Sequence, residues 1–522
     1  MSERDWEQAG HAGDGAGRAG GRSARAGGRS EHAGDSAVPE SAQRQPLRRL
    51  IRGLRSSGPG RAGLALLAIL SVTAVAVIII YPRDFGSAYW GNPAHWADNP
   101  RSVPPVWASL FYRDGAFSHR IIARYEPEET ETTPRAHLHT WSFPFEYRSD
   151  ETPTSVIVAM REFTFETRPP IVSGTLIRPD GGEVLLFREV VSGGRPGESA
   201  PFVRHAEDPQ RIVMRGEGVA GESLAAHYRD RYDLPLDAGR VRNDFEMLIF
   251  GRRDGERVEP LHGEYVFRLA VMAADEGDSL TEARVVIGGS VFGVMGTDAL
   301  GRDLALGLLY GLPIALAIGL ATSTVSTVLG TSLGLVSGYT GGRTDLAIQR
   351  AADIVANIPV LPLLIFLVFI GGSQLWLILL VLVAFSWPGL TIMVRTMVLQ
   401  LRQGPEVEAA VSLGASRTRI IIHHVFPHTA SYVFAQLVFF APSAVLAEAG
   451  LSFLGLGDPT IPTWGQILEH GFRTGAVFLG YWWWVIPPGL LIVITAVTFM
   501  LLALGMESIV DPRLKGARIW RS

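Results

Sequence analysis

Apolar residues follow two different patterns in the two parts of this chain. After residue 300, long uninterrupted apolar runs are separated by short polar segments, whereas the region from 82 to 292 holds only short apolar stretches between charged and turn-forming residues. An apolar run of about 20 residues suits a helix that crosses the hydrocarbon core of a bilayer. Short β-branched or alternating stretches favour strands. The pattern therefore predicts a helical membrane protein that carries a large β-rich segment.

The first long apolar run covers residues 62–81 and predicts transmembrane helix 1. Its length and lack of charge favour a span, and the long leader without a small-residue cleavage site argues against a signal peptide. Residues 1–56 are rich in Gly, Ala, Arg and Ser and predict a disordered tail. The tail is expected in the cytoplasm because positive charge collects on that side. Arginines precede the run at Arg48, Arg49, Arg52, Arg55 and Arg61.

Five further spans are predicted within a core of residues 296–513. They cover residues 312–336, 355–370, 375–394, 430–449 and 485–504. The segment 341–353 is expected to be a charged loop, and residues 481–484 an aromatic anchor at the membrane surface. If the six spans alternate, the basic loops share the side of the N-terminus, so both termini, including a tail of residues 511–522, are expected in the cytoplasm.

Residues 82–292 are expected to form a mostly β domain outside the cytoplasm, because they follow an outward-going span. The segment is long enough to bury a core of its own. His137 and His139 lie two apart beside Trp141, but no third ligand is near in sequence, so no metal site is predicted. Strands are predicted at residues 155–160, 171–177, 184–187, 265–271 and 283–287.

Composition limits the chemistry that the chain can perform. It has no cysteine, which excludes disulfides and thiolate metal sites. Its single lysine, Lys515, is followed by residues that do not complete the Gly-Lys-Ser/Thr of a phosphate-binding loop. No catalytic residue and no cofactor are predicted, so the chain is not expected to be an enzyme. ATP, if it drives the protein, must be bound by another subunit.

A polar segment at residues 404–428 separates the fourth and fifth predicted spans. Ala and Glu favour a short helix there, a glycine ends it, and a proline starts or kinks the next span. The order Glu408, Ala409, Ala410, Gly414, Pro427 resembles the EAA loop of ABC importer permeases, which is cytoplasmic and docks on the ATPase. The departures are His424 and Phe426. The resemblance implies docking residues Glu408, Ala409, Ala410, Gly414, Ala415, Arg417, Arg419 and Pro427.

Two further motifs resemble the oligopeptide/dipeptide/nickel branch of these permeases. Residues 296–303 read GTDALGRD, residues 448–457 read EAGLSFLGLG, and Asp511-Pro512-Arg513 closes the similar region. Buried ionisable groups within a membrane are candidates for function. The alternatives are local helix capping and pairing for the first motif, and a packing hydrogen bond for the second. Candidates for the pathway or its gate are Glu448, Ser452, Asp298, Arg302 and Asp303.

The resemblance implies a polytopic α-helical protein with the type I ABC importer permease fold, with six transmembrane helices and the β-rich insertion between the first two. It implies a permease subunit that forms half of a pathway for peptides or related small solutes in the bacterial inner membrane. The implied partners are two ABC ATPase subunits that bind ATP and Mg, a second homologous permease, an extracytoplasmic solute-binding protein and the lipid bilayer. No nucleic acid partner is expected.

Other functions stay open at this point. The chain could be a membrane-anchored sensor with an extracytoplasmic ligand-binding domain, although no segment after the first span is long enough for an output module. It could carry another solute, such as a nickel chelate or a sugar. An enzyme would have to use His423, His424 and His428, which in the sequence lack a fixed carboxylate partner.

Overall fold

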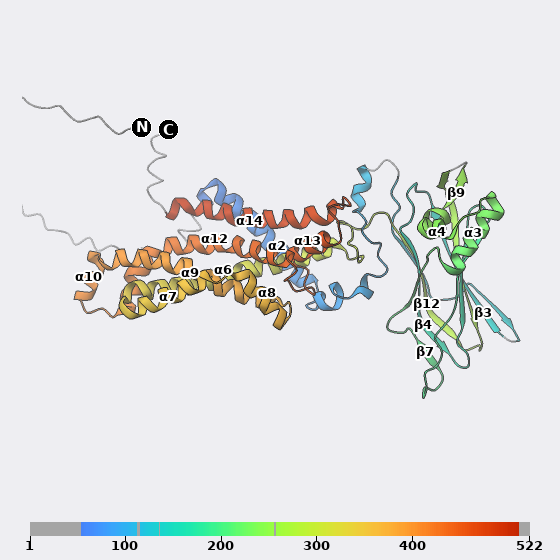
Figure 1. The fold of residues 1–522 in the computed structure, drawn as a ribbon, viewed down its shortest axis with the longest axis horizontal. Coiled ribbons are helices and arrows are strands. Elements are labelled where there is room, and N and C mark those ends of the chain that lie inside the picture. Colours follow the sequence, from blue (N-terminus) through green and yellow to red (C-terminus); the bar gives the residue numbers. More distant parts are fainter. Residues whose placement is uncertain (1–53, 112–114, 135, 255–256, 511–522) are drawn as a thin grey trace, which may run out of the picture. The chain divides into compact units, whose positions relative to one another are not determined.

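The structure is a computed structural model that describes residues 54–510, except residues 112–114, 135 and 255–256. The tails predicted at 1–56 and 511–522 lie almost wholly outside the described residues. Two kinds of architecture alternate along the chain (Figure 1): a helix, a β-rich part and then a helical core. The helices of the core and the helix before the β-rich part are α2 (Gly58–Ile80), α6 (Leu304–Thr340), α7 (Gly342–Asn357), α8 (Val360–Gly371), α9 (Leu375–Arg402), α10 (Pro405–Ser412), α11 (Arg417–Ile420), the π-helical turn η5 (Ile421–Val425), α12 (Phe426–Phe453), α13 (Trp464–Arg473) and α14 (Trp482–Val510).

Among the described residues, five helices are long and apolar enough to cross a membrane, and a sixth span results if the bent pair α7–α8 counts as one. The two helices of that pair meet at 78°. The continuous helix predicted at 355–370 is therefore wrong, and so is the loop predicted at 341–353, which is the helix α7. The break falls at Ile358, which is extended because the ring of Pro359 disfavours a helical conformation of the preceding residue.

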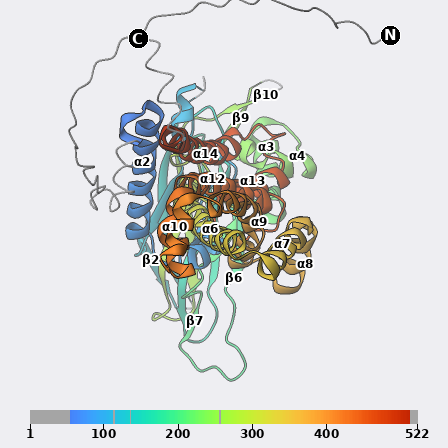
Figure 2. The ribbon, with the colours of Figure 1, turned by 90° about the vertical axis from the view of Figure 1, so that its left-hand side faces the viewer.

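Helix α6 lies beside α9 (Figure 2). Three glycines of α6 make the contact close. A Cβ at Gly334 would lie 2.7 Å from the Cβ of Val394 and 2.8 Å from the carbonyl oxygen of Thr391. Gly330 and Gly338 meet α9 in the same way. Small residues allow membrane helices to approach closely and to gain van der Waals contact that larger side chains would prevent. Helix α12 contacts α6 as well, and α14 packs against both α2 and α12.

The β-rich part contains two five-stranded antiparallel sheets that share one apolar core. One sheet has the order β1-β12-β4-β7, with β8 also pairing with β4, and the other has the order β2-β3-β11-β5-β6. Side chains such as Phe143, Val158, Phe267 and Val285 from both sheets meet in this core. The strands are β1 (Arg120–Arg124), β2 (Glu129–Thr133), β3 (Ala136–Tyr147), β4 (Ser155–Phe165), β5 (Ile171–Ile177), β6 (Glu183–Val190), β7 (Phe202–Arg204), β8 (Gln210–Val213), β11 (Gly263–Ala273) and β12 (Ser279–Gly288).

All five predicted strand segments lie within observed strands, and β5 has the predicted bounds. His137 and His139 lie on β3, where their ring nitrogens are within hydrogen-bond distance of Thr132 and Thr130 on β2. Three short helices and a two-stranded ribbon complete this part: α3 (Gly218–Tyr232), α4 (Ala238–Asn243), α5 (Phe245–Ile249), β9 (Gly251–Asp254) and β10 (Arg257–Pro260).

The chain between α2 and β1 forms three short helices and joins the sheets to the helical core. These are η2 (Phe85–Trp90), η3 (Pro93–Trp96) and η4 (Val106–Phe111). Asp98, just after η3, accepts hydrogen bonds from Arg211 of β8 at 2.9 Å and from Arg284 of β12 at 3.1 Å. The residues that follow pair with the segment that leads into α6. The strands are thus tied to α6 both covalently and through this carboxylate.

The glycine contact between α6 and α9 gives the first prediction. The substitution Gly334→Leu should destabilise the helical core by about 1–3 kcal/mol, because its side chain must enter space that Val394 and a backbone carbonyl already fill. Thermal unfolding in detergent measures the effect. The control is Gly389→Leu on α9, where an added Cβ has no neighbour within 4 Å. Equal unfolding temperatures for the two variants would contradict the close packing.

Candidate functional site

The segment between α9 and α12 folds as a helical hairpin. Helix α10 begins with Pro405 at its first turn, where proline's missing N–H costs nothing, and carries Glu406 and Glu408 at its positive dipole end. The turn follows at Gly414, whose φ of +78° is one that glycine adopts without strain. The Ser416 hydroxyl then caps α11 by accepting a hydrogen bond from the N–H of Arg419. From there α11, η5 and α12 continue as one long helical stretch.

The hairpin is fixed to the spans on one side and exposed on the other. Ala410 and Val407 are buried in a cluster with Val398 of α9 and with Ile420 and Val425. Of the other residues predicted to dock on an ATPase, Ala415 is half-buried, and the following are exposed: Glu408, Ala409, Gly414, Arg417, Arg419 and Pro427.

An apolar residue at the tip of the hairpin was missed in the sequence. Leu413 is 87 % exposed and lies directly before the turn at Gly414. A leucine directly before the glycine at which the loop reverses is the signal in the sequence that could have identified it. A hollow of about 530 Å³ lies beside α10, and its lining includes Glu408, Val411 and Arg417 together with the ends of α6 and α9.

A carboxylate fastens the two arms of the hairpin together. Glu406 lies 3.1 Å from Nδ1 of His424 and 2.9 Å from Nε2 of His428. These two hydrogen bonds hold the pKa of Glu406 below its ordinary value. The expectation that these histidines lack a fixed carboxylate partner is therefore wrong for His424 and His428. They are one helical turn apart, and the turn at Gly414 folds α10 back toward them.

The second candidate region is the loop of residues 296–303 before α6. Asp298 is fully buried and accepts hydrogen bonds from the backbone N–H groups of Leu300 and Arg302. Its other oxygen pairs with the guanidinium of Arg302 at 2.5 Å. That guanidinium lies 4.2 Å from the ring centroid of Trp90, in a cation–π contact. Asp303 caps α6 by accepting a hydrogen bond from the N–H of Ala305.

Two segments from distant parts of the sequence hold this loop by hydrogen bonds. The backbone of Ser102 donates to the carbonyl of Asp298, and the side-chain amide of Asn99 donates to the carbonyl of Gly301. The indole of Trp483, at the start of α14, donates to the carbonyl of Thr297. The loop is thus fixed between the segment that follows η3 and the first turn of α14.

The burial of Trp483 corrects one expectation about the predicted aromatic anchor. Trp483 is 5 % exposed and Trp484 is 1 % exposed, and the indole of Trp484 donates to the carbonyl of Ile467. Both indoles therefore pack inside the protein and bond to its backbone. Only Tyr481 and Trp482 of the predicted anchor keep partly exposed side chains.

Glu448 lies near the C-terminal end of α12 in a small polar cluster. It is 3 % exposed, and the hydroxyl of Ser452 donates to it at 2.6 Å. Thr463, the cap of α13, lies 3.5 Å from the same hydroxyl. Near the other end of α13, Nδ1 of His470 lies 3.2 Å from the guanidinium of Arg302. The five predicted pathway residues thus fall into two clusters, and α13 touches both. Neither Thr463 nor His470 was predicted as a site residue.

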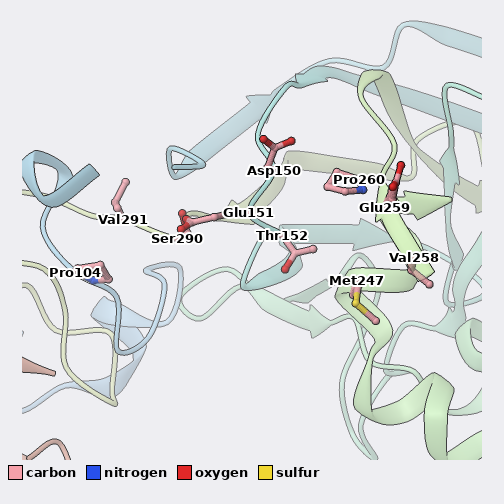
Figure 3. Close-up of a pocket in the computed structure, with 10 residues that line it drawn as sticks. All are labelled: Pro104, Asp150, Glu151, Thr152, Met247, Val258, Glu259, Pro260, Ser290 and Val291. Carbon is pink, nitrogen blue, oxygen red and sulfur yellow. The ribbon is translucent and has the colours of Figure 1, made fainter. Parts of the chain in front are cut away.

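A second hollow lies in the β-rich part (Figure 3). It has a volume of about 550 Å³, and its lining residues include the carboxylates Asp150, Glu151 and Glu259 but no arginine. Asp150 is 3.2 Å from His262. None of the residues predicted from the sequence lines this hollow.

Comparison with known proteins agrees with this architecture. Residues 330–516 match the family model described as the binding-protein-dependent transport system inner membrane component. The chain is 34 % identical over 221 residues to the dipeptide transport system permease protein DppC of Bacillus subtilis, which covers 42 % of this chain and 68 % of that protein. The fold and the match define the membrane component of a binding-protein-dependent transport system.

More specifically, the chain belongs to the oligopeptide/dipeptide permease family. It is 32 % identical over 175 residues to the oligopeptide transport system permease protein OppC of Bacillus subtilis, covering 33 % of this chain and 56 % of that protein. It is 34 % identical over 176 residues to the glutathione transport system permease protein GsiD of Shigella dysenteriae, covering 34 % of this chain and 57 % of that protein. The chain thus spans little more than half the length of these two relatives.

The contact between His470 and Arg302 gives a prediction about pH. Burial, followed by the charge of Arg302, lowers the pKa of His470 to about 4, although Asp298 opposes the shift. The unfolded chain, with an ordinary histidine pKa, therefore binds more protons between about pH 6.5 and pH 4, and stability must fall as pH falls through that range. From about pH 7.5 to about pH 5, the loss should reach ~2 kcal/mol.

Thermal unfolding at the two pH values measures this loss. In His470→Asn, the amide oxygen can still accept the hydrogen bond of Arg302 but does not titrate, so the variant should lose less stability than the parent on acidification. The same substitution at the exposed His423 controls for removal of a histidine. If His470→Asn loses as much stability on acidification as the parent does, the titration of His470 is not the cause of that loss.

Proposed function

We propose that this chain is the permease subunit of an ATP-driven importer for peptides or related small solutes. It forms half of the translocation pathway in a bacterial inner membrane, with the type I permease fold and both termini in the cytoplasm. The observation that carries this proposal is the hairpin α10–α11, which is buried against α9 and α12 on one face and exposed on the other. Peptides are favoured because the relatives are named as permeases for dipeptides, oligopeptides and glutathione.

Two ATPase subunits, which bind ATP and Mg, act on the exposed face of the hairpin. Leu413 and Glu408 are its contacts, and the hollow beside α10 receives part of the ATPase. When the ATPases close, the hairpin moves as a unit because Glu406 holds its two arms together. The buried face transmits this movement to α9 and α12, and rigid-body tilting of these helices opens the pathway on one side of the membrane and closes it on the other.

A second permease completes the pathway, and a solute-binding protein delivers the solute at the outer face. The clusters around Glu448 and around Asp298 and Arg302 form part of the outer gate. Helix α13 contacts both clusters, so they move together when α12 tilts. The β-rich part contacts the binding protein, and Asp98 links its strands to the segment that holds the loop before α6.

The docking proposal is tested by co-purification from native membranes in mild detergent. We expect Glu408→Lys and Leu413→Asp to reduce the recovered ATPase about ten-fold or more, which corresponds to a loss of about 1.4 kcal/mol of binding. Gly414→Pro should have the same effect because proline cannot adopt the φ of +78° at the turn.

The matched control for this experiment is Asp353→Lys. It makes the same change of charge on the exposed surface of α7, outside the hairpin. It should retain the ATPase. If the hairpin variants retain the ATPase as fully as Asp353→Lys does, the hairpin is not the coupling element and the sensor alternative is reopened.

The link between the strands and the core gives a further prediction. Asp98→Ala should reduce solute uptake in vesicles that contain the assembled transporter, while capture of the binding protein is retained. The control is Asp208→Ala, because Asp208 pairs with the same Arg211 but is 77 % exposed, and exposed pairs contribute little. Equal uptake by the two variants would show that Asp98 does not link the strands to transport.

A further inference from the structure

An exposed apolar surface lies where the β-rich part meets the helical core. The helix η4, with the sequence VWASLF, exposes Leu110 by 82 % and Phe111 by 81 %, and it contains no charged or strongly polar side chain apart from Ser109. Val294, which precedes α6, is 64 % exposed. It lies beside η4, because its carbonyl accepts a hydrogen bond from the indole of Trp107. Exposed apolar side chains that gather in this way mark an interaction surface rather than ordinary solvent-facing surface.

A second apolar segment lies between α13 and α14. The loop of residues 475–480 reads GAVFLG, and it exposes Val477, Phe478 and Leu479 by 52 %, 86 % and 60 %. Its shape is fixed, because the backbone of Tyr481 donates to the carbonyl of Ala476, and Ala476 itself is fully buried. The loop is therefore built to hold three apolar side chains outward, and it contains no charged residue.

Both segments adjoin the first residue of a membrane span. Trp482 begins α14, whose apolar run is long enough to cross a bilayer. The ring of Trp107 in η4 lies 5.2 Å from the ring of Trp482, and the apolar loop ends two residues before it. Figure 1 places the light-blue segment that contains η4 beside the start of α14, in agreement with this contact. Tryptophan at the end of a span belongs to the boundary between hydrocarbon and headgroups, because its ring is apolar and its N–H needs a polar partner.

We propose that η4 and the loop 475–480 together form an apolar collar that inserts into the membrane interface around the start of α14. The occupant is the boundary between lipid headgroups and acyl chains. A bilayer is favoured over a protein partner because the collar continues the surface of a span and offers no charge for specific docking. Aromatic and aliphatic side chains without charge are what an interfacial segment presents to lipid.

The collar also fixes the connection between the strands and the spans. The backbone of Val106 donates to the carbonyl of Gly293, and the backbone of Phe292 donates to the carbonyl of Pro104. The segments that enter and leave the β-rich part are thus bonded together directly beside η4. Insertion of η4 into lipid would hold these two segments at the membrane surface, so that the β-rich part is attached to the bilayer at its base as well as to α2 and α6.

The absence of cysteine from the chain allows a direct test with single labels. Leu110→Cys and Phe478→Cys would each carry a small environment-sensitive fluorophore, in the full chain reconstituted into phosphatidylcholine–phosphatidylglycerol vesicles. Ile79→Cys, 77 % exposed near the end of the span α2, is the control for contact with lipid. Val190→Cys, 60 % exposed at the end of strand β6, is the control for contact with water.

We expect both collar labels to be quenched by lipids that carry a nitroxide near the carbonyl end of the acyl chain, as at Ile79, and to resist quenching by aqueous iodide. The label at Val190 should be quenched by aqueous iodide and should resist quenching by the nitroxide lipids. Strong iodide quenching at Leu110 and Phe478 in vesicles, without lipid quenching, would overturn the proposal. Protection that develops only after the sister permease or the binding protein is added would also overturn it, because the occupant would then be a protein.

A functional variant complements the labels. Leu110→Ser combined with Phe111→Ser removes the two most exposed apolar side chains of η4, neither of which belongs to the core of the strands. The thermal unfolding of this variant in detergent should match that of the parent, while its Phe478→Cys label should become more accessible to iodide in vesicles. An unchanged label environment would show that η4 does not help to hold the loop in lipid.

Discussion

The buried ion pair between Asp298 and Arg302 is the contact on which the arrangement of this molecule depends. A carboxylate without exposure to solvent is stable only when its charge and its hydrogen-bonding capacity are satisfied. Arg302 supplies the charge, and backbone N–H groups of the same loop supply further hydrogen bonds. Because Arg302 also contacts Trp90 and His470, one pair fixes the positions of the segment after α2, the start of α6 and helix α13.

The two ends of the helical core differ in what they leave exposed. At the loop before α6, polar groups are turned inward and bonded to backbone from several segments, which suits a part that changes position only as a whole. At the hairpin α10–α11, one face is buried among the spans while Leu413 and the charged residues face outward. A rigid connection with an exposed outer face can pass on a movement imposed by a partner, and this asymmetry supports the direction of coupling that we propose.

The β-rich part has no counterpart in the residues matched by the family model, which begin at residue 330. It is nevertheless built into the molecule rather than merely linked to it. Asp98 connects two of its strands to the chain beside the Asp298 loop, and the backbone around Val106 is paired with the segment that enters α6. An additional part attached at several points can influence the spans, whereas one joined by a flexible linker could not.

The sequence alone determined those features that depend on local composition and spacing. Uncharged apolar runs identified the long helices, β-branched stretches identified strands such as β5, and short motifs identified the family. The bend at Pro359 was also encoded locally, although the length of the apolar run concealed it. The hairpin was predictable for the same reason, since Gly414 breaks a helix whatever surrounds it.

The tertiary structure decided which side chains meet across long intervals of sequence. Glu406 contacts His424 and His428 only because the chain reverses between them. Arg302 contacts His470 only because α13 lies against the loop of residues 296–303. Tryptophan is a residue type typical of a membrane surface. Trp483 and Trp484 are nevertheless buried, because they pack against the loop of residues 296–303 and against α13. A local pattern specifies which backbone conformation and which environment a residue favours. Its partner is decided by how the elements pack, because packing brings together groups that no spacing rule relates.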